Sequence, residues 1–163
     1  MKTLLQTVVV AVSGSEASIK AAKYGITLAR FYRCRLVAVY VVDTATLKEL
    51  LLSRIFIDEE SREYEKSLEL NGQRYLNYVE ELAQKKGVAV EKFLRSGAIS
   101  TEIVEAADEN KADLILLGGL QEHEEKGILR DSLSRQHREI LKHARCSILF
   151  VKEPEIETIY RKL

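Results

Sequence analysis

Apolar residues fall into short runs that are separated by longer amphipathic stretches. The runs at 7–12 and 35–42 are almost continuously apolar and rich in valine. Runs of this kind are typical of strands that a parallel sheet buries on both faces. Further strand-like runs at 88–94, 113–117 and 147–151 predict three more strands.

The intervening stretches predict helices. Small apolar residues recur at three- and four-residue spacing over 16–32, which would let this helix pack closely on a sheet. A long charged helix is expected from Asp58 to Gly87, and Gly72 could kink or interrupt it. Further helices are expected at 101–109, capped by Ser100, and directly before the last strand.

Strands that alternate with helices predict an α/β fold, with a doubly wound parallel sheet of five strands and helices on both faces. Ligands of such sheets bind beyond the carboxyl ends of the strands, where the strand order reverses. If the first and fourth strands flank this reversal, the turn Ser13-Gly14-Ser15 would face Gly118-Gly119 across one crevice. We expect one domain over 1–154 and a short charged tail over 155–163.

Two segments are expected to meet other proteins. From Leu47 to Ile57 the apolar residues fit a short helix followed by an irregular stretch, which suggests a lid or an interface for a protein partner. From Ser147 to Val151 the last strand would form an edge of the sheet. An edge this apolar is rarely left uncovered in water, so we expect a homodimer that forms through this strand.

Composition excludes several classes of partner. The 163 residues include 25 lysines and arginines against 25 aspartates and glutamates, so no broad basic field is present to attract nucleic acid. No apolar run approaches the roughly 20 residues that a membrane helix requires, and we expect a soluble, cytoplasmic protein. Cys34 and Cys146 each begin a strand-like run, and we expect small buried residues rather than redox or metal groups.

The segment 112–119 carries the first indication of chemistry. A buried strand that leads into Gly118-Gly119 is the arrangement from which α/β proteins build phosphate-binding sites. A phosphate cradle would need further glycines, however, and the chain continues with Leu120-Gln121-Glu122-His123-Glu124-Glu125. Some of these residues are metal-ligand types, but adjacent ligands diverge in direction, so a solvated acidic loop is favoured over a metal site.

Other catalytic interpretations compete with simpler ones. The segment 13–18 faintly resembles the SGGxDS loop of ATP pyrophosphatases, but a serine-capped helix explains the same residues. Asp131, Ser132, Ser134 and His137 lie close in sequence, yet no oxyanion hole is indicated. Asp131 or Ser132 is expected to cap the last helix instead. We therefore expect no catalytic residue, and enzyme activity is the less favoured interpretation.

Over nearly its whole length the chain resembles the universal stress protein family. The resemblance rests on the first strand and its Gly-Ser turn at 7–15, on the glycine and helix at 97–107, on 112–118 and on 143–151. It implies strand order 3-2-1-4-5, cytoplasmic stress-related roles, and homodimers formed through the fifth strand. Members of this family divide into nucleotide binders and non-binders.

Nucleotide-binding members of the family carry an aspartate after the first strand. After the fourth strand they carry a loop of the form G-x-x-G, nine residues, then G and Ser or Thr. In this chain Ser13 stands at the aspartate position, and Gln121 and Asp131 stand at the second and third glycines. Residues 135–137 resemble an insertion beyond this loop. The resemblance implies that bound ATP or AMP would contact Ser13, Val41, Gly118, Gly119, Ser132 and Ser134.

These departures from the family pattern weigh against ATP binding. A lost hydrogen bond to a charged group costs roughly 1.5–3 kcal/mol. A carboxylate about 4 Å from a phosphate repels it by roughly 4 kcal/mol at an effective dielectric of about 20, which by itself separates micromolar from millimolar affinity. We therefore expect a stress-response regulator with weak or no ATP binding. The alternative is an adenine-nucleotide sensor with a variant glycine loop and slow ATP hydrolysis.

Overall fold

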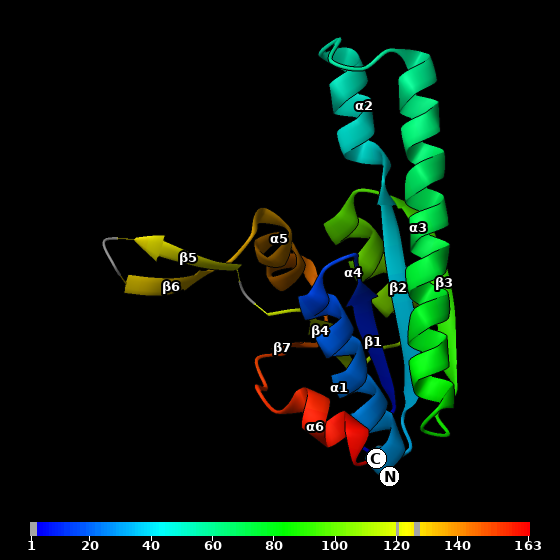
Figure 1. Cartoon of the computed structure of the whole chain (residues 1–163), viewed down its shortest axis with the longest axis vertical. Helices are drawn as coiled ribbons and strands as arrows, with labels where there is room; N and C mark the ends of the chain where they lie inside the picture. Colours follow the sequence, from blue (N-terminus) through cyan, green and yellow to red (C-terminus); the bar gives the residue numbers. More distant parts are fainter. Residues whose placement is uncertain (1–2, 120, 126–127) are drawn as a thin grey trace.

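The computed structural model describes residues 3–119, 121–125 and 128–163, with the backbone alone described for 121–125 and 128–132. Its centre is a five-stranded sheet in which neighbouring strands pair in parallel (Figure 1). The order β3-β2-β1-β4-β7 confirms the predicted fold class and the order 3-2-1-4-5. The strands are β1 (Thr7–Val12), β2 (Arg35–Asp43), β3 (Val90–Gly97), β4 (Leu114–Leu117) and β7 (Ser147–Phe150).

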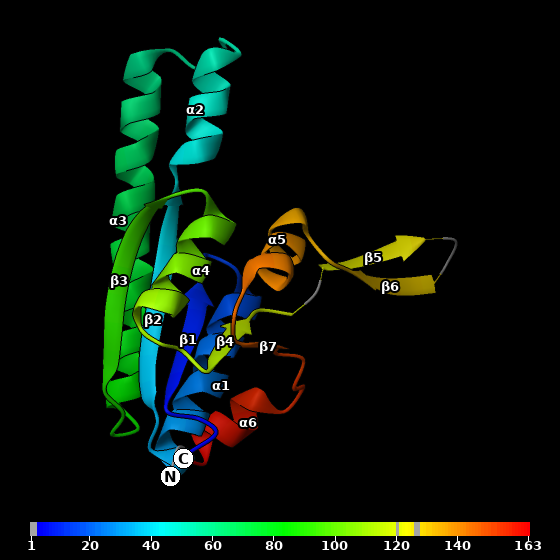
Figure 2. The ribbon, with the colours of Figure 1, turned by 180° about the vertical axis from the view of Figure 1, so that it is seen from behind.

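Helices cover both faces of this sheet (Figures 1 and 2). One face carries α1 (Glu16–Tyr32), α3 (Asp58–Gln84) and α6 (Ile156–Arg161), and the other carries α4 (Ile99–Glu109) and α5 (Arg135–His143). Val8 and Val10 of β1 belong to the core under α1 and α3, whereas Val9 belongs to the core under α4 and α5. Burial of both faces explains why the strand sequences lack alternation. No helix in the described ranges is long and apolar enough to cross a membrane.

The segment after β2 forms a helical arm. α2 (Thr44–Leu52) and the first half of α3 lie side by side and extend beyond the carboxyl ends of the strands (Figures 1 and 2). The predicted short helix followed by an irregular stretch is confirmed, since residues 53–57 lie outside regular structure. At the end of the arm, Leu52, Ile55 and Ile57 are 77%, 64% and 61% exposed.

Gly72 does not interrupt α3, which corrects an expectation from the sequence. The helix continues without a break from Asp58 to Gln84. A Cβ atom at residue 72 would lie 2.6 Å from side-chain atoms of both Tyr40 and Leu94. The glycine therefore allows the helix to approach β2 and β3 closely.

The start of α4 also differs from the prediction. β3 extends to Gly97, whose φ of 145° turns the chain sharply. α4 then begins at Ile99, with Ala98 in the cap position and no side chain bonded there. Ser100 lies within the first turn, so the predicted Ser100 cap is wrong.

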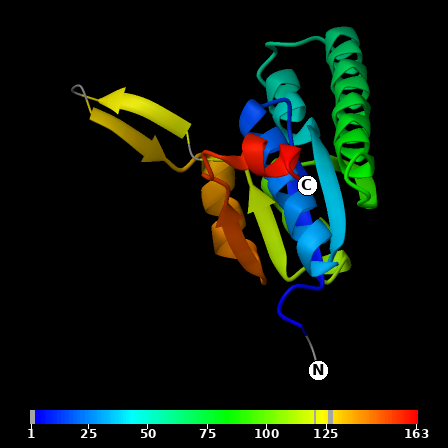
Figure 3. The same cartoon turned by 60° about the horizontal axis from the view of Figure 1, so that its bottom comes forward.

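Residues 121–125 and 128–132 form the two strands of a β-hairpin that the sequence did not predict. β5 (Gln121–Glu125) pairs antiparallel with β6 (Ile128–Ser132), from Gln121 opposite Ser132 to Glu125 opposite Ile128. The hairpin projects from the body of the molecule (Figure 3). The predicted acidic loop at 122–125 is wrong, because the backbone there forms a strand. The strand was missed because a run of polar residues lacks the apolar alternation that marks a strand in sequence.

The last residues fold back onto the domain. Ile156 of α6 is buried, and the Tyr160 hydroxyl donates to the Leu82 carbonyl oxygen at 2.7 Å. The ammonium groups of Lys23 and Lys86 lie 5.3 and 4.8 Å from the centroid of the Tyr160 ring. α6 thereby joins α1 to the end of α3.

Cys34 and Cys146 stand directly before β2 and β7 as free thiols. Cys34 is buried and Cys146 is half-buried. Burial raises the pKa of both thiols, which lowers their reactivity. The expectation of a small buried residue is confirmed for Cys34, whereas Cys146 is only half-buried.

Candidate ligand-binding crevice

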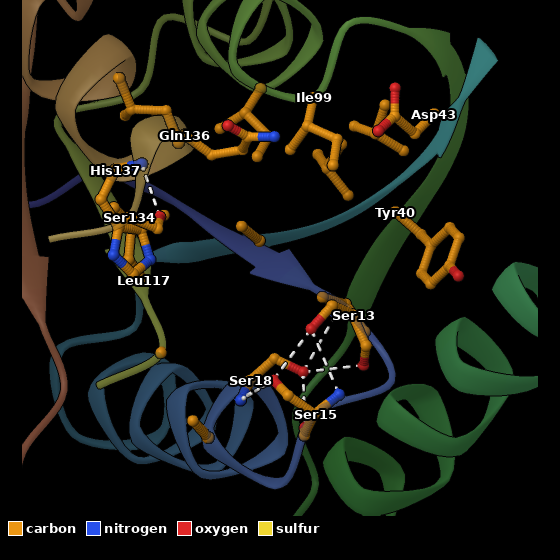
Figure 4. A pocket seen from close by; sticks show the side chains of 18 of the residues that line it. Ser13, Ser15, Ser18, Tyr40, Asp43, Ile99, Leu117, Ser134, Gln136 and His137 are labelled. Carbon is orange, nitrogen blue, oxygen red and sulfur yellow. Dashed lines mark hydrogen bonds between the residues drawn. The ribbon is translucent and has the colours of Figure 1, made fainter. Parts of the chain in front are cut away.

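A crevice of about 600 Å³ opens at the carboxyl ends of β1 and β4 (Figure 4). Doubly wound sheets bind ligands at this position, because the chain leaves neighbouring strands toward helices on opposite faces. Here β1 leads into α1 on one face, while the segment after β4 leads into α5 on the other. The strand ends and both helices contribute lining residues.

Most of the predicted nucleotide-contact residues line this crevice. The turn after β1 and the loop after β4 face one cavity, as the topology predicted. The side chain of Ser132 lies outside the described part of the structure, as do those of Gln121 and Asp131. The structure brings together Ser13, Val41, Gly118, Gly119 and Ser134.

Three serines form a hydrogen-bonded cluster at the turn after β1 (Figure 4). Ser18 Oγ donates to the Ser13 carbonyl oxygen at 2.8 Å, and Ser13 N donates to Ser18 Oγ at 3.0 Å. Ser15 caps α1 by accepting from Ser18 N at 3.2 Å, and its hydroxyl lies 2.9 Å from that of Ser13. The turn is therefore closed by neutral groups, and it offers a ligand hydroxyls rather than a carboxylate.

The glycines after β4 have a packing role that does not depend on phosphate. A Cβ atom on Gly118 would lie 2.9 Å from the carbonyl carbon of Ala17 and 3.0 Å from Ser18 N. Only glycine therefore lets the end of β4 approach α1 so closely. A Cβ atom on Gly119 would lie 3.2 Å from the carbonyl oxygen of Val151.

Asp43 is the one formally charged residue among the described residues that line the crevice. Its carboxylate accepts from Thr46 N at 3.0 Å and from Thr46 Oγ at 2.7 Å, and so caps α2. No lysine or arginine lines the described part of the crevice. Among the described residues, a phosphate group would meet only backbone N–H groups and hydroxyls, which bind it less strongly than cations do.

The first turn of α5 forms the wall across from the serine cluster (Figure 4). Ser134 caps this helix by accepting from His137 N at 3.1 Å. The predicted cap by Asp131 or Ser132 is wrong, because β6 continues to Ser132. Gln136 and His137 line the crevice from this turn. Neither residue was predicted from the sequence to line the crevice. The only signal was that residues 135–137 resemble an insertion beyond the family's loop.

His137 is held in a largely apolar setting. Its ring packs edge-on against Phe150, with centroids 5.1 Å apart and planes inclined by 74°. Burial lowers the pKa of His137, so the imidazole is neutral near pH 7. Its Nδ1 atom is covered by protein and meets no hydrogen-bond partner among the described residues.

The described residues form no catalytic or metal-binding arrangement. Ser134 Oγ is engaged as a helix cap rather than paired with an imidazole nitrogen. Within the described ranges there is no group of three or more histidine, cysteine, aspartate and glutamate side chains placed to hold a metal ion.

Comparisons with known proteins agree on one family. A sequence model described as "Universal stress protein family" matches residues 5–152. Universal stress protein MJ0531 of Methanocaldococcus jannaschii is 32% identical over 163 residues, covering 96% of this chain and 87% of that protein. A crystal structure of a universal stress protein family member from Burkholderia pseudomallei matches with a TM-score of 0.70 at 23% identity, covering 94% of this chain and 100% of that one. An Arabidopsis thaliana family protein with AMP bound matches with a TM-score of 0.63 at 17% identity, covering 94% and 95%.

Proposed function

The chain belongs to the universal stress protein family, and we propose that it is a non-catalytic, homodimeric stress-response regulator in the cytoplasm that binds ATP weakly or not at all. One observation carries the proposal. The crevice presents a neutral serine cluster around Ser13, with no lysine or arginine among its described lining residues.

Weak ATP binding follows from the groups that the nucleotide would meet. Nucleotide-binding family members carry an aspartate at the position of Ser13, where the carboxylate would bond the ribose or the adenine. Losing a hydrogen bond to a charged group costs roughly 1.5–3 kcal/mol, which lowers affinity by about tenfold to a hundredfold. The Ser13 hydroxyl is also engaged by Ser15 Oγ at 2.9 Å. Asp131 adds a further negative charge to the sequence of the loop.

The second candidate is an adenine-nucleotide sensor that binds AMP or ATP in an altered pose and hydrolyses ATP slowly. The AMP complex of the Arabidopsis protein supports it. The caps of α1 and α5, Ser15 and Ser134, both line the crevice, and helix N-termini stabilise anions. Such a ligand would contact Gly118, Gly119, Ser132 and Ser134.

Isothermal titration calorimetry with ATP and AMP tests the proposal. For the unaltered chain we expect an ATP Kd above about 100 μM. The triple variant Ser13→Asp, Gln121→Gly, Asp131→Gly should bind ATP about tenfold more tightly or better, because it restores the family's carboxylate at position 13 and removes the negative charge at position 131.

Ser53→Asp is the matched control, because it adds a carboxylate at an exposed position after α2. It should leave ATP affinity unchanged. Micromolar ATP binding by the unaltered chain would refute the proposal, and AMP or ATP that copurifies with the protein would favour the sensor. If the triple variant binds no better, the three departures are not what abolishes binding.

The helical arm is the proposed contact for a protein partner. The segment from Leu47 to Ile57 ends in the three exposed aliphatic side chains described above. Clustered exposed apolar side chains mark interaction surfaces more often than isolated ones do. This contact would leave the crevice free.

A further inference from the structure

The first turn of α5 places two neutral polar side chains, Gln136 and His137, on the crevice wall (Figure 4). We infer that they select an uncharged purine nucleoside with a 6-amino group, for which adenosine is the probe, over the corresponding nucleotides. This inference rests on the proposed function, because both require a crevice that disfavours phosphate.

His137 is set up to donate one hydrogen bond to a ligand. A neutral imidazole carries one N–H and one lone pair. Its Nδ1 atom is covered and unpartnered among the described residues. A buried lone pair is tolerated better than a buried N–H, so the proton resides on Nε2. Since His137 lines the crevice, Nε2–H is the polar group left to meet an acceptor atom.

Gln136 supplies the complementary pair of groups. Its amide extends toward the cavity (Figure 4), and no hydrogen bond joins it to another described residue. A glutamine amide pairs in two places with adenine, because it accepts from the 6-amino group and donates to N7. A 6-carbonyl purine presents an acceptor where the amide needs a donor.

The remaining walls fit the same class of ligand. Tyr40, Leu68 and Ile99 supply apolar surface for a planar ring. The volume of about 600 Å³ lies within the roughly 300–1,000 Å³ typical of small-ligand sites. Since no cation lines the described crevice, a nucleotide brings charge that the described side chains do not compensate, whereas a nucleoside brings none.

Calorimetric titration of the full chain with adenosine, inosine, AMP and ATP tests the inference. Adenosine should bind at least about tenfold more tightly than ATP, and inosine about tenfold more weakly than adenosine, since it exchanges the 6-amino group for a carbonyl. Gln136→Leu should weaken adenosine binding by about tenfold and His137→Phe by about fivefold.

Matched controls lie outside the crevice. Gln73 is exposed on α3, and His143 is exposed in the last turn of α5. Neither Gln73→Leu nor His143→Phe should change adenosine affinity. Gln136→Glu keeps a polar side chain at this half-buried position and serves as the second variant if Gln136→Leu does not fold. It too should weaken adenosine binding, because it removes the donor to N7.

The outcomes separate the inference from the proposed function. Equal affinity for adenosine and inosine, or no effect of either Gln136 variant, would overturn the inference. No binding of any of the four compounds would overturn the inference and leave the weak-ATP proposal standing. Micromolar ATP binding with weaker adenosine binding would overturn both.

Discussion

At the scale of single residues, Asp113 shows how one side chain can fix the relation between two strands. Its Oδ2 accepts from Gln6 N at 2.8 Å and from Thr7 N at 3.0 Å. The sequence predicted only that Asp113 begins a strand, because a bond to a residue 106 positions away leaves no local pattern. Ser13 and Gly118 could be located because each directly follows a predicted strand.

Replacing Asp113 should therefore weaken the whole domain. We expect Asp113→Ala to lower the free energy of unfolding by about 2 kcal/mol, because the backbone donors lose a charged acceptor. Urea denaturation followed by circular dichroism measures this. The matched control is Asp108→Ala, whose carboxylate is 39% exposed and lies 3.9 Å from Arg145 Nε; it should cost less than about 0.5 kcal/mol. Equal losses in both variants would show that Asp113 has no special structural role.

At the scale of secondary structure, periodicity located the strands and helices that carry apolar residues and failed for those that do not. The helix at 16–32 was predicted with its observed bounds. The β5–β6 hairpin was missed because its backbone pairing is not accompanied by an apolar pattern. The Ser100 cap failed for another reason, since the turn at Gly97 lies two residues before Ile99 and moves the helix start.

Gly72 gives a prediction at this scale. Alanine favours helices over glycine by about 1 kcal/mol, so Gly72→Ala would stabilise an isolated α3. In the protein its Cβ would lie 2.6 Å from Tyr40 and Leu94 atoms, and overpacking of this kind costs roughly 1–3 kcal/mol.

We expect a net loss of about 1 kcal/mol or more and a lower Tm in thermal denaturation. Ser67→Ala, at an exposed position of the same helix, controls for propensity and should be neutral or slightly stabilising. A higher Tm for Gly72→Ala would mean that α3 is not packed tightly on the sheet.

At the scale of the molecule, the alternation of strands and helices predicted a parallel sheet, and the family resemblance implied the order of its strands. The crevice followed from that order, since carboxyl ends of parallel strands meet at one edge. The contribution of Gln136 and His137 to its wall could not be predicted, because both belong to a turn whose position depends on where β6 ends.

The edge position of β7 carries the prediction for assembly. Among the described strands, none pairs with its outer side, and Ile148, Leu149 and Phe150 are only half-buried. We expect a homodimer formed through this strand, with a mass by light scattering of twice the 18.5 kDa chain mass. A monomer that persists at concentrations of about 100 μM would contradict this expectation.

The central position of β1 also governs how a nascent chain can assemble. β1 can pair with β2 once both have been synthesised, but its other neighbour, β4, is among the last strands to be made. During that interval the apolar edge formed by Val8, Val9 and Val10 has no strand beside it. Unpaired strand edges are where folding chains aggregate. A ribosome that stalls before Leu114 would therefore release a product that is prone to aggregation, and chaperones that shield strand edges would be needed most at this stage.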